Sequence, residues 1–187
     1  MPSPMITVDG FGVPVEVAGP EKGSVVVVLG AAHQAPAAYE PVCQRLHTAS
    51  LKTVVIGPDP RLTAKSVIGV LDALDVSWAL LVGDRLGGEL AWELAATRLD
   101  RFTGLVVIDR GHPRVADLAG VVRDERCPPV ELNTTALVST PAARAVAKAT
   151  QRFVYGDYRV VDLLGRRNAA DSTAQLAAEI VMRTSTW

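Results

Sequence analysis

Residues 78–95 constrain what this chain can fold into more than any other stretch, because an apolar strand, a sharp corner and an amphipathic helix follow one another without a spacer. The corner contains Gly83, Gly87 and Gly88, and glycine lets a backbone turn tightly. A turn of this kind lifts one side chain above the end of a parallel sheet. The lifted residue here is Arg85, a cation that cannot act as a nucleophile at neutral pH.

The rest of the chain alternates predicted strands with predicted helices. Apolar runs and alternating patterns predict strands at residues 5–8, 13–18, 24–29, 53–56, 79–82, 104–108, 135–138 and 159–163. Apolar residues at helical spacing predict helices at residues 36–47, 63–74, 86–99, 141–152 and 173–183. This alternation is typical of an α/β fold, so we expect a mostly parallel central sheet of about seven or eight strands flanked by helices. The chain shows no linker and no repeat, and residues 1–187 are expected to form one domain.

Composition and charge narrow the classes of function. Apolar residues make up 49% of the chain and the net charge is −1, so neither disorder nor a nucleic-acid partner is expected. No apolar run approaches the ~18 residues that span a bilayer, and the first residues lack the order of a signal peptide. Cys43 and Cys127 stand far apart without a CxxC partner, which fits free thiols in a reducing compartment. We therefore expect a cytoplasmic protein that does not bind a membrane.

The order of these features resembles the α/β-hydrolase fold superfamily of esterases, haloperoxidases and dehalogenases over nearly the whole chain. A valine-rich strand runs into a Gly loop at residues 29–32, where the family keeps one half of its oxyanion hole. The corner at residues 83–88 stands in the place of the family's nucleophile elbow, G-x-S-x-G. Residues 105–109 and 159–165 are similar to the family's next core strand and to the strand that delivers its catalytic His.

All three positions of the family's catalytic triad carry the wrong kind of residue. Arg85 stands in the place of the serine. The His is expected a few residues after residue 165, where Arg167 or Asn168 stands instead, and Asn cannot shuttle a proton. The acid is expected at residues 139–142, which contain no carboxylate. Asp109 is an alternative acid position, but without a base to orient we interpret it as a loop or cap aspartate.

Asp84 invites comparison with haloalkane dehalogenases and epoxide hydrolases, which use Asp at the elbow. It precedes the elbow position by one residue, and a shift of one residue at the end of a strand turns the side chain to the opposite face. We therefore expect Asp84 to be a buried or paired carboxylate, with Arg85 or Arg110 as its partner.

The chain contains three histidines. His47 is expected at the polar end of a helix. His33 and His112 fall in loops near the C-terminal edge of the predicted sheet, where open α/β sheets bind ligands. The two either meet above Arg85 or are exposed loop residues without a role. The sequence has no metal-ligand spacing and no phosphate or dinucleotide fingerprint, so no metal and no cofactor are expected.

The expected site is open, because only about twenty residues, 111–129, stand where family enzymes insert a lid. We expect a minimal lid or none, and a shallow pocket from which water is poorly excluded.

Three hypotheses about function remain. The first is a catalytically inactive relative that binds a small anionic or polar ligand, or a protein partner, at the degenerate elbow. The elbow consists of Gly83, Asp84, Arg85, Leu86 and Gly87, and the candidate ligand contacts are Arg85, Ala31, Leu86, His33, Arg110, His112 and Arg167. The arginines are expected to make this site cationic and suited to a carboxylate or phosphate. The second is a true esterase- or dehalogenase-like hydrolase that uses Asp84 with His33 or His112. The third is a structural homodimer without a ligand.

Overall fold

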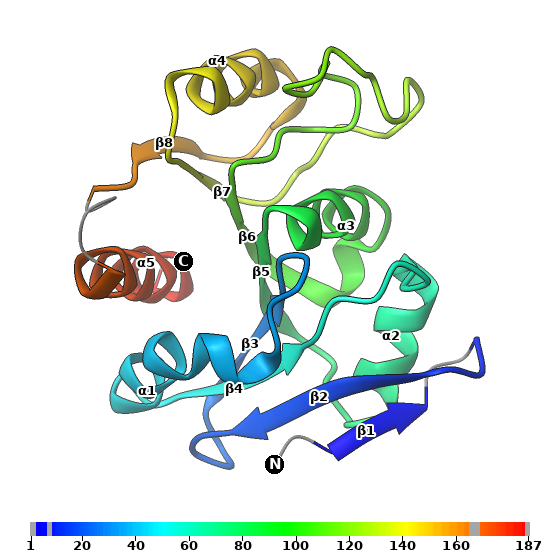
Figure 1. Ribbon diagram of the computed structural model, residues 1–187, viewed down its shortest axis with the longest axis vertical. Coiled ribbons are helices and arrows are strands. Elements are labelled where there is room, and N and C mark those ends of the chain that lie inside the picture. Colours follow the sequence, from blue (N-terminus) through cyan, green and yellow to red (C-terminus); the bar gives the residue numbers. More distant parts are fainter. Residues whose placement is uncertain (1–2, 7–8, 165–168, 186–187) are drawn as a thin grey trace.

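The computed structural model describes residues 3–6, 9–164 and 169–185, and within them eight strands form one sheet in the order β1-β2-β4-β3-β5-β6-β7-β8 (Figure 1). Their bounds are β1 (Ser3–Ile6), β2 (Gly12–Ala18), β3 (Ser24–Leu29), β4 (Leu51–Ile56), β5 (Ala79–Asp84), β6 (Phe102–Ile108), β7 (Thr134–Val138) and β8 (Tyr158–Asp162). β2 pairs antiparallel with β1 and β4, and all other neighbours are parallel. The predicted fold class is confirmed.

The helices cover both faces of the sheet (Figure 1). Their bounds are α1 (Glu40–Thr48), α2 (Ala64–Ala73), α3 (Leu86–Thr97), α4 (Pro141–Thr150) and α5 (Ala169–Thr184), with short 3-10 turns at Pro36–Tyr39, Leu99–Arg101 and Gln151–Phe153. α1 and α5 lie on one face, and α2 and α3 lie on the other. None of the helices within the described residues is long and apolar enough to cross a membrane.

The valine run of β3 is explained by its position at the centre of the sheet, where both faces are buried. Val26 and Val28 contact the core under α1 and α5, whereas Val27 and Leu29 contact the core under α2 and α3. A parallel strand that is covered on both sides needs apolar residues at every position. The strand therefore loses the alternation that marks β2, which lies near the edge.

Several element boundaries differ from those predicted. The first strand is Ser3–Ile6 rather than residues 5–8, and residues 7–8 lie outside the described part of the chain. The predicted helix at residues 36–47 begins with a 3-10 turn, and α1 starts only at Glu40, followed by Pro41. Proline has no N–H to donate and is tolerated in the first turn of a helix, which explains this late start.

Residues 111–129 contain neither helix nor strand, and His112 anchors them to the core. Its side chain is fully buried, stacks on Phe153 at 4.9 Å between ring centroids and meets Trp92 edge-on at 5.8 Å. Nε2 lies 2.7 Å from the carbonyl oxygen of Pro128, which can only accept, and Nδ1 accepts the N–H of Arg114 at 3.1 Å. Both contacts are satisfied by the neutral imidazole with its proton on Nε2. His112 is thus neither above Arg85 nor exposed, contrary to both expectations.

Burial, reinforced by Arg114 and Arg123 nearby, lowers the pKa of His112 below its ordinary value. At pH values between the pKa of His112 in the folded chain and its pKa in the unfolded chain, the unfolded chain binds more protons. Stability therefore rises with pH in that window. We expect the free energy of unfolding of the wild type to fall as the pH drops below about 6.5, by at most ~1.4 kcal/mol per pH unit from this group.

Urea unfolding measured from about pH 7.5 to about pH 5.5 checks this expectation. His112→Gln keeps a donor for Pro128 but does not titrate, so its slope with pH should be smaller than that of the wild type. His33→Gln is the matched control, because His33 is exposed, and it should leave the slope unchanged. Equal slopes in all three proteins would contradict a buried neutral His112.

Candidate functional site

The corner between β5 and α3 has the strained backbone that its sequence predicts. β5 ends at Asp84, α3 begins at Leu86, and Arg85 between them has φ +49° and ψ −105°. This conformation is rare for a residue with a side chain and persists only where the surroundings hold it. Here the Arg85 N–H donates to the carbonyl of Ile108 at 3.0 Å, and the Arg85 carbonyl accepts from Gly88 N at 2.8 Å.

Glycine is required at this corner because α3 starts against the end of a neighbouring strand. A Cβ on Gly87 would lie 2.1 Å from the carbonyl oxygen of Leu29, and a Cβ on Gly83 would lie 2.5 Å from Gly88 Cα. Both distances are shorter than real Cβ contacts. The glycine pattern of the sequence thus reports the packing of strand and helix, whichever residue occupies position 85.

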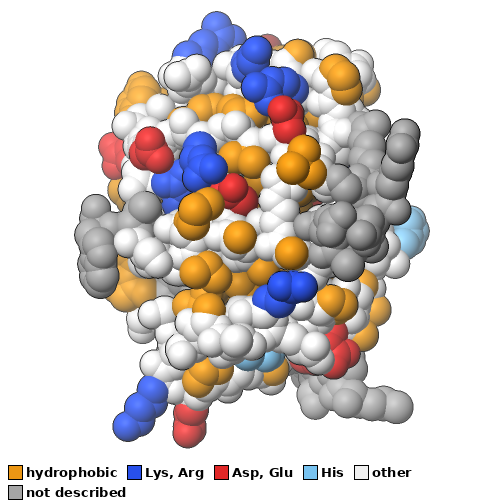
Figure 2. Space-filling model, turned by 90° about the vertical axis from the view of Figure 1, so that its left-hand side faces the viewer, with side chains coloured by type: hydrophobic (Ala, Val, Ile, Leu, Met, Phe, Trp, Pro, Cys, Tyr) orange, Lys and Arg blue, Asp and Glu red, His pale blue; other side chains and the backbone are white. Residues whose placement is uncertain are grey.

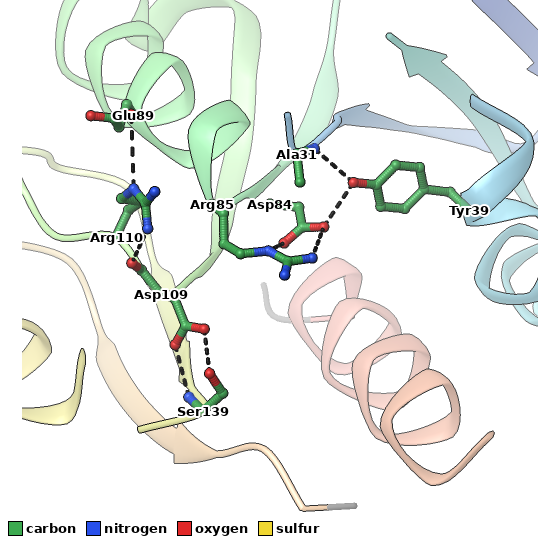
Figure 3. A network of polar contacts seen from close by, with 8 residues as sticks. All are labelled: Ala31, Tyr39, Asp84, Arg85, Glu89, Asp109, Arg110 and Ser139. Atoms are coloured by element: carbon green, nitrogen blue, oxygen red, sulfur yellow. Dashed lines mark hydrogen bonds and ion pairs between the residues drawn. The ribbon is translucent and has the colours of Figure 1, made fainter. Parts of the chain in front are cut away.

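Arg85 is held by the carboxylate that precedes it (Figure 3). Its Nε lies 3.0 Å from Asp84 Oδ1 and its Nη2 lies 3.2 Å from Asp84 Oδ2. The side chain of Asp84 is 8% exposed and that of Arg85 is 53% exposed, so the pair reaches from the interior to the surface. The hydrogen bonds to Asp84 raise the pKa of Arg85 above its ordinary value, and the guanidinium stays charged. Asp84 is therefore a buried, paired carboxylate, as predicted, with Arg85 as its partner; Arg110 does not pair with it.

The hydroxyl of Tyr39 completes this network. It donates to Asp84 Oδ2 at 2.7 Å and accepts the backbone N–H of Ala31 at 2.7 Å (Figure 3). Burial raises the pKa of Tyr39, so the hydroxyl keeps the proton that it donates. Ala31 follows β3 in the loop where the resemblance implies an oxyanion hole, and its N–H already has a partner. The sequence places Tyr39 at an apolar helical position, and no signal there indicates that its hydroxyl reaches Asp84.

A second polar group follows β6. Asp109 has φ +56°, and its carboxylate accepts the backbone N–H of Ser139 at 2.8 Å and a short hydrogen bond from the Ser139 hydroxyl (Figure 3). The predicted loop aspartate is therefore a link between the ends of β6 and β7. Arg110 turns away from Arg85, with its Nη1 2.9 Å from the Asp109 carbonyl and its Nε 3.8 Å from Glu89.

None of the three histidines lies at the elbow, and all three are within the described residues. His33 is exposed in the loop after β3, with φ +63°. His47 contacts the Thr53 hydroxyl at 2.8 Å, and His112 is buried against Phe153. Across the described ranges, no three His, Cys, Asp or Glu side chains come together as a metal site would need.

Arg85 faces a hollow of 310 Å³ between the sheet edge, α1 and the start of α5. The hollow is lined by Gln34, Ala38, Tyr39, Val42, Asp84, Arg85, Ile108, Asp109, Ser139, Leu163, Ser172, Thr173 and Leu176. Among the described residues, its lining charges are the carboxylates of Asp84 and Asp109 and the guanidinium of Arg85. The expected cationic site also counted Arg167, which lies outside the described residues, so that expectation stays a prediction. On the side of the molecule that carries α1 and α5, basic and acidic side chains both occur among apolar ones (Figure 2).

The structure separates several of the predicted ligand contacts. Leu86 lines a different hollow, and Arg110 points to Glu89. None of Leu86, Arg110 and His33 lines the hollow of Arg85. For Arg110 the sequence does not reveal this, because it does not show the positive φ of Asp109, the residue before it. Arg167 and Asn168, the predicted place of the family His, lie outside the described residues.

The strain at Arg85 predicts an unusual order of stabilities. Arg85→Gly and Arg85→Ala both lose the pair with Asp84, but only glycine adopts φ +49° freely, so Arg85→Gly should be about 1 kcal/mol more stable than Arg85→Ala. Lys65, exposed in α2, is the control: Lys65→Gly should be ~1 kcal/mol less stable than Lys65→Ala, as usual in a helix. Urea unfolding of the four variants measures both differences. If Arg85→Ala were more stable than Arg85→Gly, the backbone at position 85 would not be strained.

No protein-family model and no curated protein matches this sequence. Solved structures match it over nearly its whole length. An epoxide hydrolase from Vigna radiata is 11% identical with a TM-score of 0.76, covering 100% of this chain and 98% of its own. An esterase from Exiguobacterium antarcticum is 14% identical with a TM-score of 0.75, covering 96% of this chain and 99% of its own. A haloalkane dehalogenase variant from Bradyrhizobium elkanii is 12% identical with a TM-score of 0.72, covering 98% of this chain and 97% of its own.

Likeness at such low identity speaks for the arrangement of the chain and not for its chemistry. The mostly parallel sheet flanked by helices agrees with these neighbours. This protein therefore has the α/β-hydrolase fold.

Proposed function

We propose that this protein is a catalytically inactive α/β-hydrolase-fold protein that binds a small polar ligand through Arg85. The observation that carries the proposal is the state of the elbow: its tip is a guanidinium fixed by Asp84 and half exposed to a hollow of 310 Å³. Such an arrangement presents a donor group for binding at the position where a hydrolase of this fold presents its nucleophile.

Acyl transfer requires a nucleophile, a base and an oxyanion hole, and the state of each of the three supports inactivity. The elbow carries a cation in place of a nucleophile. A base to activate a nucleophile would have to be a histidine near the elbow, and His33, His47 and His112 all make their contacts elsewhere or face solvent. The N–H of Ala31, in the loop where the family keeps one half of its oxyanion hole, already donates to the Tyr39 hydroxyl. An oxyanion would have to displace this hydroxyl before it could use that donor.

The geometry of Arg85 supports binding. Nε and Nη2 hold Asp84, and within the described part of the chain Nη1 has no hydrogen-bond partner. A guanidinium that is already fixed loses little side-chain entropy when it binds an acceptor. Asp84 balances the charge of Arg85, and Asp109 adds a carboxylate to the same hollow. A neutral or zwitterionic ligand, with an acceptor for Arg85 and a donor for Asp109, fits this balance better than a simple anion.

The hydrolase hypothesis finds less support in the contacts of Asp84. Its Oδ1 accepts from Arg85, and its Oδ2 accepts from both Arg85 and Tyr39. A carboxylate with these partners is a poor nucleophile, because attack would remove charge from hydrogen bonds that stabilise it.

The first prediction from this proposal concerns activity. Wild-type protein should hydrolyse p-nitrophenyl acetate no faster than buffer with albumin. Arg85→Ser should also be inactive and should not be labelled by a fluorophosphonate, because a serine without a base is a poor nucleophile. Steady-state absorbance assays and mass spectrometry of the intact protein provide the two measurements.

Two outcomes would overturn inactivity. One is ester hydrolysis by the wild type that is lost in Asp84→Asn or His33→Ala. The other is saturable labelling of Arg85→Ser, which would mean that a base reaches the elbow.

The second prediction concerns binding. Acetamide, glycine and acetate are a neutral, a zwitterionic and an anionic probe of the same small size. In a ¹⁵N NMR titration of the arginine Nε–H groups, acetamide and glycine should shift the signal of Arg85 more than acetate does. For any compound that binds there, Arg85→Ala should weaken binding by ~1.5–3 kcal/mol, the scale of a charged hydrogen bond.

Arg98→Ala is the matched control, because Arg98 holds Asp100 through the same two nitrogens on an exposed surface. It should leave binding unchanged. A shift of the Arg85 signal by acetate alone would contradict the proposed charge balance. No shift with any probe, or equal effects of the two alanine variants, would contradict binding at Arg85.

A further inference from the structure

A second and larger hollow of 440 Å³ lies beside α3 and shares no lining residue with the hollow of Arg85. Its walls come from the end of β3, the segment after β4, the first turns of α3 and the irregular residues 113–127. Ligand pockets of proteins range from roughly 300 to 1,000 Å³, so this hollow is large enough for a small organic molecule.

The inner wall of this hollow is apolar. It is formed by Leu29, Pro58, Leu62, Leu86, Leu90 and Pro113. Leu86 is 41% exposed, which is unusual for a leucine at the start of a buried helix, and Leu62 and Leu90 are half-buried. An apolar body that enters the hollow would remove these side chains from water, which is favourable.

Carboxylates surround the apolar wall: Asp59, Glu89, Glu93 and Asp124 line the hollow, together with the guanidinium of Arg123. Two of them are neutralised. Asp59 forms a two-pronged pair with Arg61, and Glu89 lies 3.3 Å from Arg123 and 3.8 Å from Arg110. Arg123 also donates to the carbonyl of Gly111 at 3.0 Å, so its position is fixed.

Glu93 and Asp124 are the carboxylates that remain. Across the described residues neither carboxylate has an ion-pair partner, and that of Asp124 accepts only the backbone N–H of Arg126, at 2.9 Å. Neither carboxylate is therefore neutralised by an ion pair, and both line the same hollow as the apolar side chains. A carboxylate ligand would meet like charge here, whereas a cationic group would be attracted.

We propose that this hollow binds a small molecule with an apolar body and a cationic ammonium head. The body lies against Leu62, Leu86 and Leu90, and the head lies near Glu93 and Asp124. The site is independent of Arg85 and of the function proposed above. Cys127 also lines the hollow, but burial raises the pKa of its thiol to about 11, so it acts there as an apolar group.

The test compares three probes that differ only in the head group: hexylammonium, hexanol and hexanoate. In a ¹H–¹⁵N NMR titration at neutral pH, hexylammonium should give saturable shifts at the amides of Leu62, Leu86 and Leu90. It should bind roughly tenfold or more tightly than hexanoate, with hexanol between them. Added salt should weaken the binding of hexylammonium and leave that of hexanol nearly unchanged.

Variants separate the parts of the site. Glu93→Gln combined with Asp124→Asn should remove the preference for hexylammonium over hexanol while hexanol still binds. Glu125→Gln is the matched control, since Glu125 is an exposed neighbour of Asp124 that does not line the hollow. Arg85→Ala should have no effect on any of the three probes. The NMR spectrum of each free variant shows whether it is folded.

Three results would overturn the proposal. The first is the absence of saturable shifts for hexylammonium up to about 10 mM, the range of a weak ligand. The second is equal binding of hexanoate and hexylammonium. The third is binding that depends on Arg85 and not on Glu93 and Asp124, which would place the ligand in the other hollow.

Discussion

The close approach of α3 to the end of β3 is the constraint on which the rest of the site depends. Because a Cβ on Gly87 would lie 2.1 Å from the Leu29 carbonyl, any side chain there forces the helix away from the sheet. That contact fixes where α3 begins, and with it the turn that holds Arg85 at φ +49°. Arg85 and Asp84 lie just before this contact in the chain, and the loop that carries Ala31 follows Leu29 directly. The glycines of the corner thus serve the packing of α3 against β3, and the chemistry of the corner depends on the residue at its tip.

A short chain of hydrogen bonds passes through this corner and is centred on Asp84. It runs from the Ala31 N–H through the Tyr39 hydroxyl and the Asp84 carboxylate to Arg85, and it joins the loop after β3 to the start of α1 and the end of β5. Each polar group is satisfied by the protein itself, which avoids the penalty of burying Asp84 unpaired. The same chain engages the N–H of Ala31, in the loop where the resemblance implies an oxyanion hole. Arg85 is the member of the chain that still faces solvent.

The sequence was a good guide to the sheet and a poor guide to long-range side-chain contacts. The four valines of β3 and the glycines of the corner predict their places, because burial on both faces and close backbone approach leave few alternatives. The pairing of Asp84 with its neighbour was also predictable, since adjacent residues stay near each other in any fold. Tyr39, His112 and Arg110 were not, because their partners come from distant segments. Arg110 and His112 also follow Asp109, whose positive φ the sequence does not reveal.

The glycines of the corner also bear on how such chains are grouped. A pattern that records Gly83 and Gly87 but ignores the residue between them selects for a steric fit between a helix and a strand. Two further features describe the site itself: the residue at the tip of the corner, and the partner of the Ala31 N–H, the second N–H after β3. In this protein the residue at the tip is Arg85, and the partner of the Ala31 N–H is the Tyr39 hydroxyl. These two groups describe the site better than the glycine turn does.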